Sequence, residues 1–253
     1  MMIDRVVRGL RRTYEYVVLF GSLALFGSLG LLYSILGAIL YPLLPRRLGA
    51  RVGRLIMTVL CRLYLALIQG SGIVKCDLSV LDALSGEEAI IIAPNHPSLI
   101  DVILVGSRLS NIVCIMKAEI GHNLLFGGGA LLSGYIRNDS TGNMVRRAVT
   151  ELKQGSQLLI FPEGTRTTRQ PVNAFKSAFG LIARKSQAPV QTVFIETNTP
   201  FLGKGWSLLK KPQFPLYYRV TLGKRFAAGS DTRAFVAELE HYFKEQMATR
   251  KPG

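Results

Sequence analysis

Ala89-Ile90-Ile91-Ile92-Ala93-Pro94-Asn95-His96-Pro97-Ser98-Leu99-Ile100-Asp101 is the stretch that decides the fold. Its first five residues form a short apolar run, which is typical of a buried strand. Pro97 suits the first position of a helix, because its missing N–H needs no partner there. We therefore predict a strand, a turn that holds His96, and a helix in which Asp101 lies about one turn from the start.

The rest of the chain repeats this alternation of strands and helices. Further apolar runs typical of strands lie at residues 112–116, 157–161, 189–195 and 217–222. Helical patterns lie at residues 98–109, 143–154, 174–186 and 231–248. This order predicts an α/β domain over residues 70–253, with a layered mixed sheet flanked by helices. In such domains ligands usually bind at the carboxyl ends of strands.

Residues 1–69 are predicted to form a membrane-attached helical segment. The 28 residues from 17 to 44 carry no charge, and about twenty apolar residues suffice to cross a bilayer core. No small-residue cleavage site follows them, so we expect the segment to remain on the mature protein. Residues 55–68 show helical apolar spacing, which suits either the membrane interface or packing on the domain.

Arginines flank this apolar stretch on both sides. Four precede it between residues 5 and 12, and four follow between residues 46 and 54. Positive flanks favour the cytoplasmic side, and a single span cannot place both there. We therefore favour a helical hairpin with Gly27 and Gly30 near its bend, over a single span.

The composition of the whole chain points to anionic partners. Among 253 residues, 31 Lys and Arg outnumber 16 Asp and Glu, which gives a formal net charge of +15. Together with the apolar N-terminus, this charge favours membrane lipids over nucleic acid, for which no binding signature is present. The three cysteines, at positions 61, 76 and 114, form no metal-binding spacing and suit a reducing cytosol.

The spacing of His96 and Asp101 suits acid–base chemistry. A carboxylate one helical turn away can bind one imidazole nitrogen and fix the tautomer. The other nitrogen is then free to accept a proton from a hydroxyl. The alternative is a purely structural pair, with the histidine satisfied inside the fold and the aspartate serving the helix N-terminus.

A second motif, Phe161-Pro162-Glu163-Gly164-Thr165-Arg166, also follows an apolar strand. Gly164 permits a sharp turn. Thr165 and Arg166 offer a hydroxyl and a guanidinium fork, which suit phosphate oxygens. Glu163 could orient the arginine or accept a hydrogen bond from a substrate hydroxyl. An ordinary surface turn is the alternative.

The two motifs together resemble those of the glycerolipid acyltransferases, typified by 1-acylglycerol-3-phosphate acyltransferase, over roughly residues 88–225. The resemblance implies transfer of an acyl chain from a thioester to a hydroxyl. It implies that His96 is the general base and that Asp101 orients it. It also implies that Glu163, Gly164, Thr165 and Arg166 belong to the acceptor site.

Two further basic residues enter through the same resemblance. Arg137, in Gly134-Tyr135-Ile136-Arg137, matches an arginine that meets the acceptor phosphate in this family. The glycine lies closer to the arginine than usual and the usual phenylalanine is missing, which leaves the acceptor open. Lys117 matches a common lysine and is either a phosphate contact or a solvated side chain.

The sequence thus predicts an O-acyltransferase that needs no metal or bound cofactor. We expect acyl-CoA or acyl carrier protein as the donor and a lysophospholipid, similar to 1-acylglycerol-3-phosphate, as the acceptor. We expect the protein at a bacterial inner membrane, with its catalytic domain on the cytoplasmic side. The alternatives are acylation of another lipid or carrier-bound hydroxyl, and a catalytically silent scaffold that binds membrane lipid.

Overall fold

The computed structural model describes residues 2–250. The helices lie at Met2–Leu43 (α1), Arg46–Gly70 (α2), Asp101–Gly106 (α3), Gly127–Leu132 (α4), Thr141–Lys153 (α5), Ser177–Ser186 (α6) and Thr232–Thr249 (α7), with 3-10 helices at Ser79–Leu84 and Ala118–His122. The strands lie at Val74–Asp77 (β1), Ile91–Pro94 (β2), Ile112–Met116 (β3), Ile136–Arg137 (β4), Gln157–Leu159 (β5), Val190–Thr197 (β6) and Leu216–Phe226 (β7).

The strands form one mixed sheet in the order β1-β7-β6-β2-β5-β3-β4. Neighbouring strands are parallel except for β6 and β7, which are antiparallel. The carboxyl ends of β2, β3, β4, β5 and β6 therefore lie along one edge. The predicted mixed sheet flanked by helices is confirmed.

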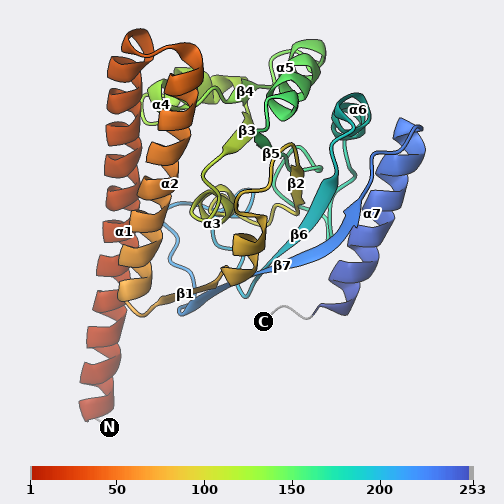
Figure 1. Cartoon of the computed structure of the whole chain (residues 1–253). Coiled ribbons are helices and arrows are strands. Elements are labelled where there is room, and N and C mark those ends of the chain that lie inside the picture. The colour runs from red at the N-terminus through yellow and green to blue at the C-terminus, as the bar shows by residue number, and fades with distance from the viewer. Residues whose placement is uncertain (1, 251–253) are drawn as a thin grey trace.

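Helices cover both faces of the sheet because its central strands are apolar on both sides. Ile92 faces the cluster formed with α2, α3 and Leu19 of α1, whereas Ile91 faces the cluster formed with α5, α6 and α7. Both side chains are fully buried. Figure 1 shows the α1–α2 pair along one side of the sheet and α5, α6 and α7 along the other. Such burial on two faces explains why β2 reads as a continuous apolar run.

Each predicted apolar run overlaps a strand of the sheet, and each predicted helical pattern overlaps a helix. The helix after His96 is shorter than predicted, since α3 begins only at Asp101. Ser98 and Leu99 instead belong to the turn, where the Ser98 hydroxyl donates to the Phe201 carbonyl at 2.9 Å. The sequence analysis did not identify β1, β4 or α4.

The bend predicted near Gly27 and Gly30 is wrong. Helix α1 runs through both glycines without a break, and the chain reverses at Leu44 and Pro45. Pro45 disfavours a helical conformation at the residue before it and is well suited to precede a new helix, so the reversal falls there. The two basic clusters consequently lie at different ends of α1, which has a length of about 63 Å at 1.5 Å per residue.

Helices α1 and α2 are each long and apolar enough to cross a membrane, judged by length and composition. Helix α2 also packs on the domain, burying a stripe that includes Cys61, Leu65 and Ile68. Its opposite side exposes apolar side chains at every fourth position: Leu55, Val59, Leu63 and Leu67. Packing of residues 55–68 on the domain is therefore confirmed, and contact of the exposed face with a membrane interface stays a prediction.

Arg54 fixes α2 to the α/β domain from a buried position. Its guanidinium donates to Glu151 Oε2 at 2.7 Å, to Ser156 Oγ at 2.9 Å and to Asn111 Oδ1 at 3.0 Å. Its Nε donates to the Ser133 carbonyl at 3.1 Å. A buried cation needs such partners, since an unpaired one would be strongly destabilising. Arg54 thus belongs to the packing of the protein rather than to a membrane-facing cluster.

Glycines allow α1 and α4 to pack in close backbone contact. A Cβ atom on Gly37 would lie 2.3 Å from the backbone of Gly128, and one on Gly129 would lie 2.2 Å from the Tyr33 ring. Residues 127–129 (Gly-Gly-Gly), whose composition would suit a flexible loop, are therefore helical. They form the first turn of α4, which lies against α1.

We expect Gly37→Ala to destabilise the protein, because the new methyl group would overlap backbone atoms that cannot move aside. Overpacking of this kind costs about 1–3 kcal/mol. Gly27→Ala is the matched control, since a Cβ there meets no atom within 4 Å. That change should stabilise helix α1 by about 0.5–1 kcal/mol. Thermal unfolding in detergent measures both, and equal midpoints for the two variants would contradict the close packing.

Candidate active site

The turn after β2 places His96 at the carboxyl edge of the sheet. The Asn95 side chain fixes the start of this turn. Its amide donates to the Ile195 carbonyl at 3.0 Å and accepts from the Ile195 N–H at 2.7 Å, which joins β2 to β6. Asn95 is buried, so both its polar atoms need these partners. The sequence analysis gave Asn95 no role, because its partner lies 100 residues away.

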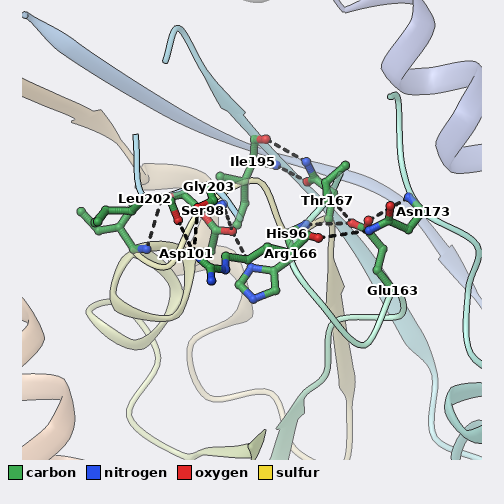
Figure 2. A network of polar contacts seen from close by, with 12 residues as sticks. His96, Ser98, Asp101, Glu163, Arg166, Thr167, Asn173, Ile195, Leu202 and Gly203 are labelled. Atoms are coloured by element: carbon green, nitrogen blue, oxygen red, sulfur yellow. Dashed lines mark hydrogen bonds and ion pairs between the residues drawn. The ribbon is translucent and has the colours of Figure 1, made fainter. Parts of the chain in front are cut away.

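His96 and Asp101 are hydrogen-bonded. His96 Nδ1 lies 2.8 Å from Asp101 Oδ2, and the same oxygen accepts from the Ser98 N–H at 2.9 Å. An ionised carboxylate can only accept hydrogen bonds, so Nδ1 carries the hydrogen. Nε2 of the neutral ring therefore keeps its lone pair and can accept a proton. Figure 2 shows the pair with the loop that surrounds it.

Burial strengthens the electrostatic coupling of the pair. Asp101 is fully buried, and burial raises the pKa of its carboxyl group, while the hydrogen bonds from His96 and Ser98 oppose that shift. A carboxylate in a low-dielectric site attracts a neighbouring cation more strongly than one in water. An imidazolium formed at His96 would therefore be stabilised by Asp101.

The imidazole ring is held by Phe161 as well. The two rings are stacked, with centroids 3.8 Å apart and planes inclined by 19°. Phe161 lies two residues after the end of β5, so the neighbouring strand supplies this support. The sequence analysis placed Phe161 in a motif but did not anticipate the stack, because only the pairing of β2 with β5 brings the two residues together.

Glu163 joins the two sequence motifs from a fully buried position. Its Oε1 accepts from the His96 N–H at 3.1 Å and from Thr167 Oγ1 at 2.7 Å. Its Oε2 accepts from the Asn173 N–H at 2.8 Å. The carboxylate thus serves the backbone of His96 and the loop after β5 (Figure 2). Its described partners are protein groups, and Arg166 is not among them.

Gly164, Thr165 and Arg166 form the turn beside Glu163. Gly164 has a φ of +67°, a conformation that glycine adopts readily because it has no Cβ atom. Its N–H donates to the Phe161 carbonyl at 2.9 Å. Thr165 is half-buried, whereas Gly164 is exposed. Arg166 Nη1 donates to the carbonyls of Leu202 and Gly203, each at 2.9 Å.

Asn173 organises the same loop, although the sequence analysis did not identify it. Its side-chain oxygen accepts from the N–H groups of Thr168 and Arg169 and from the Thr168 hydroxyl. Its side-chain amide donates to the Arg166 carbonyl at 3.1 Å. These bonds fold the loop around the Asn173 side chain and hold Arg166 next to His96.

Lys117 and Arg137 lie at the same edge of the sheet but further along it. Lys117 follows β3 and Arg137 ends β4, and both side chains are exposed. Arg137 forms an ion pair with Asp139 at 3.5 Å. Strand β5 separates them from β2. The structure therefore places them on the edge that carries His96, as candidates for a more distant part of a substrate.

Comparison with known proteins identifies similar sequences over the same part of the chain. Residues 76–196 match the family model described as Acyltransferase. The matched region runs from within β1 to within β6, and hence includes His96, Asp101 and the loop from Glu163 to Asn173.

Several named proteins resemble part of this chain. A 1-acyl-sn-glycerol-3-phosphate acyltransferase of Helicobacter pylori is 34% identical over 42% of the chain and 48% of its own length. A lyso-ornithine lipid O-acyltransferase of Pseudomonas aeruginosa is 31% identical over 43% of the chain and 46% of its own length. The chain thus aligns with about half the length of these two relatives.

Two further proteins resemble this chain over nearly its whole length. A 1-acyl-sn-glycerol-3-phosphate acyltransferase of Pseudomonas aeruginosa is 23% identical over 97% of the chain and 93% of its own length. The crystal structure of the 1-acyl-sn-glycerophosphate acyltransferase PlsC from Thermotoga maritima superposes with a TM-score of 0.66. That alignment covers 97% of this chain and 100% of the other, at 18% identity. The similarity supports a common fold that includes the N-terminal helices.

Proposed function

We propose that the protein transfers an acyl chain from a thioester to the hydroxyl group of a lysophospholipid, of the 1-acylglycerol-3-phosphate type. The observation that carries the proposal is the 2.8 Å contact between His96 Nδ1 and Asp101 Oδ2, which leaves Nε2 as a base at the edge of the sheet. The names of the relatives from Helicobacter and Pseudomonas support this acceptor class. Acyl-CoA and acyl carrier protein are the two donor classes.

The proposed reaction moves one proton twice. His96 Nε2 takes the proton of the acceptor hydroxyl while that oxygen attacks the thioester carbonyl carbon. Asp101 stabilises the imidazolium that forms. When the tetrahedral intermediate collapses, the carbon–sulfur bond breaks and the thiolate takes the proton from His96. The products are the acylated lipid and the free thiol, and the protein returns to its starting state.

Basic residues along the sheet edge are proposed to hold the acceptor. Within residues 2–250, the two carbonyl contacts are the hydrogen bonds of the Arg166 guanidinium, so Nε and Nη2 remain for a ligand. Lys117 and Arg137 would meet a more distant anionic group of donor or acceptor. Fixing both reactants makes the attack effectively unimolecular, a gain of up to about 7–11 kcal/mol.

A membrane location agrees with this chemistry, because a lysophospholipid resides in a bilayer. We propose that the exposed apolar sides of α1 and α2 attach the protein to the cytoplasmic face of a bacterial inner membrane. Leu55, Val59, Leu63 and Leu67 of α2 form one such side. The unpaired cysteines Cys61, Cys76 and Cys114 suit the reducing cytoplasm.

A second acceptor class has support of its own. The Pseudomonas relative named lyso-ornithine lipid O-acyltransferase is 31% identical over the aligned segment. Nη1 of Arg166 donates to two protein carbonyls, so fewer N–H groups of the guanidinium are available to bind a phosphate. Purified full-length protein should therefore be assayed in detergent with both donor classes and a panel of lyso-lipids, and the products identified by mass spectrometry. Product from no combination would favour a silent lipid-binding scaffold instead.

We expect Arg166→Lys to raise the acceptor KM when the acceptor carries a phosphate. A lysine offers one point charge in place of a fork, and hydrogen bonds to charged groups contribute about 1.5–3 kcal/mol. The acceptor KM should therefore rise about ten- to hundredfold while the donor KM changes little. Steady-state kinetics with each substrate varied in turn measures both constants.

Arg169→Lys is the matched control, because Arg169 is an exposed arginine of the same loop. Its kinetic constants should equal those of the parent protein. An equal loss for Arg166→Lys on an acceptor without phosphate would contradict phosphate binding. The arginine would then act only by holding the carbonyls of Leu202 and Gly203.

A further inference from the structure

The connection between β6 and β7 exposes two leucines at its tip. This connection covers residues 198–215, and its outer part is Lys204-Gly205-Trp206-Ser207-Leu208-Leu209-Lys210-Lys211, here called the 204–211 segment. Leu208 is 53% exposed and Leu209 is 74% exposed. Adjacent leucines are rarely so exposed in a water-facing loop unless a partner covers them.

The 204–211 segment has a defined shape rather than an extended one. The Lys210 N–H donates to the Ser207 carbonyl at 3.0 Å, which closes a turn around the two leucines. Trp206 Nε1 donates to the Lys210 carbonyl at 3.1 Å. The Lys210 ammonium lies 4.7 Å from the centre of the Trp206 ring. The two leucines therefore lie in a hydrogen-bonded turn, with the Trp206 indole and the Lys210 ammonium beside it.

The inner end of this segment is joined to the candidate active site. The carbonyls of Leu202 and Gly203, directly before Lys204, accept from Arg166. The Phe201 carbonyl accepts from the Ser98 hydroxyl at 2.9 Å, in the turn that carries His96. Figure 2 shows Leu202 and Gly203 beside Arg166 and Asp101. Whatever binds the leucines therefore lies close to the candidate active site.

The outer end of the segment is joined to α1. Lys211 forms an ion pair with Glu15, and its ammonium lies 5.2 Å from the centre of the Tyr16 ring. Tyr16 stacks on Phe20, one turn further along α1. Phe20 is exposed, as is Val17. The leucines are thus tied to a helix that itself presents apolar side chains to its surroundings.

The chemistry of the segment favours a lipid surface as the partner. Leucines at the tip suit the acyl region of a bilayer, and an indole suits the boundary with the headgroups. Lys204 and Lys210 flank the leucines, and their long stems let the charge reach anionic headgroups while the stem stays in apolar surroundings. The net charge of +15 points the same way.

We propose that the 204–211 segment is a second membrane contact, which inserts Leu208 and Leu209 into an anionic bilayer beside the active site. Together with α1 and α2, it holds the carboxyl edge of the sheet at the lipid surface. A lyso-lipid can then reach His96 from the bilayer without passing through water. The insertion itself stands apart from the proposed reaction and can be tested without activity.

Trp206 is the one tryptophan in the sequence, so its fluorescence reports on this segment alone. The full chain is placed in vesicles of phosphatidylcholine and phosphatidylglycerol, with phosphatidylcholine brominated on its acyl chains as the quencher. We expect Trp206 to be quenched. A Leu208→Ser/Leu209→Ser double variant should lower the quenching by about twofold, while α1 and α2 keep the protein in the vesicles.

Charge is tested with a matched pair of lysine variants. Lys204→Ser should reduce the quenching in anionic vesicles, because the ammonium is expected at the headgroups. Lys185→Ser, on α6 at the opposite face of the sheet, should leave the quenching unchanged. Vesicles of phosphatidylcholine alone should remove the difference between the two variants.

Three outcomes would overturn the proposal. Trp206 could remain unquenched at every lipid composition, or it could be quenched equally in the parent and in the double leucine variant. A third is an unquenched, blue-shifted emission that depends on protein concentration, which would assign the leucines to a second copy of the chain. None of these readouts requires turnover, so failure of the proposed reaction would leave them interpretable.

Discussion

Replacing His96 with alanine should lower turnover by at least about 100-fold, because general base catalysis contributes about 10²- to 10⁴-fold. Nε2 of the imidazole is the atom placed to take the hydroxyl proton, since Nδ1 is hydrogen-bonded to Asp101. A group that acts on the transition state lowers kcat without weakening acceptor binding. Single-turnover kinetics and acceptor binding to the purified variant separate these two effects.

Asp101→Asn tests the second member of the pair. Asp101 Oδ2 accepts from both His96 and Ser98, and an asparagine oxygen at the same place can keep both bonds. The loss then reports mainly the missing negative charge. We expect about 1.5–3 kcal/mol, or a ten- to hundredfold lower kcat, which is less than for His96→Ala.

Thermal unfolding is the control for both variants, because His96→Ala removes the ring that stacks on Phe161 and leaves a buried carboxylate with one partner fewer. Activity should fall far more than the folded fraction at the assay temperature. Turnover of His96→Ala within a few-fold of the parent protein would remove His96 from the mechanism. The pair would then be structural, as the sequence alone also allows.

Much of the sheet could be predicted from the sequence because its central strands are apolar on both faces. The apolar runs that form β2, β3, β5 and β6 are buried against helices on both faces of the sheet. Their apolar composition therefore indicates that they are central strands. Strands β1 and β4 escaped the same reasoning. Strand β1 contains Lys75 and Asp77 at the sheet edge, and β4 has only two residues, so neither shows an apolar run.

The N-terminal helices show where local patterns fail. Gly27 was predicted near a bend because glycine tolerates many backbone conformations. Yet glycine only permits a turn, and the neighbouring residues of α1 favour a continuous helix. Proline imposes a constraint, and the reversal occurs at Pro45. The role of residues 127–129 was likewise hidden, because close packing depends on Gly37, some ninety residues away.

The site was predictable where its parts are close in sequence. Five positions separate His96 from Asp101, and the spacing alone suggested their contact. Glu163 was predicted as part of the acceptor site, and this role stays a prediction. The structure adds three hydrogen bonds to Glu163, from His96, Thr167 and Asn173. The bond from His96 depends on β2 and β5 lying side by side. No local pattern contains that information.

Replacing Glu163 with glutamine should therefore reduce both stability and turnover. Oxygens of the carboxylate accept from the His96 N–H, the Thr167 hydroxyl and the Asn173 N–H. A glutamine has one oxygen and one NH2 group, so at least one buried donor would face another donor. An unsatisfied buried group costs about 1–3 kcal/mol, so the unfolding midpoint should fall. A small displacement of His96 should also lower kcat by about 100-fold.

Glu240→Gln separates positioning from general loss of stability. Glu240 also accepts from a backbone amide, that of Phe175 at 2.8 Å, and its other oxygen pairs with Lys244. It lies on α7 and contacts neither His96 nor its turn through a described hydrogen bond. We expect Glu240→Gln to lower the unfolding midpoint with little change in kcat.

An unchanged midpoint for Glu163→Gln together with a raised acceptor KM would point instead to a carboxylate that contacts the substrate hydroxyl. Glu163 would then belong to the acceptor site, and the backbone of His96 would depend on its other contacts, such as that between its carbonyl and the Thr167 N–H at 2.7 Å.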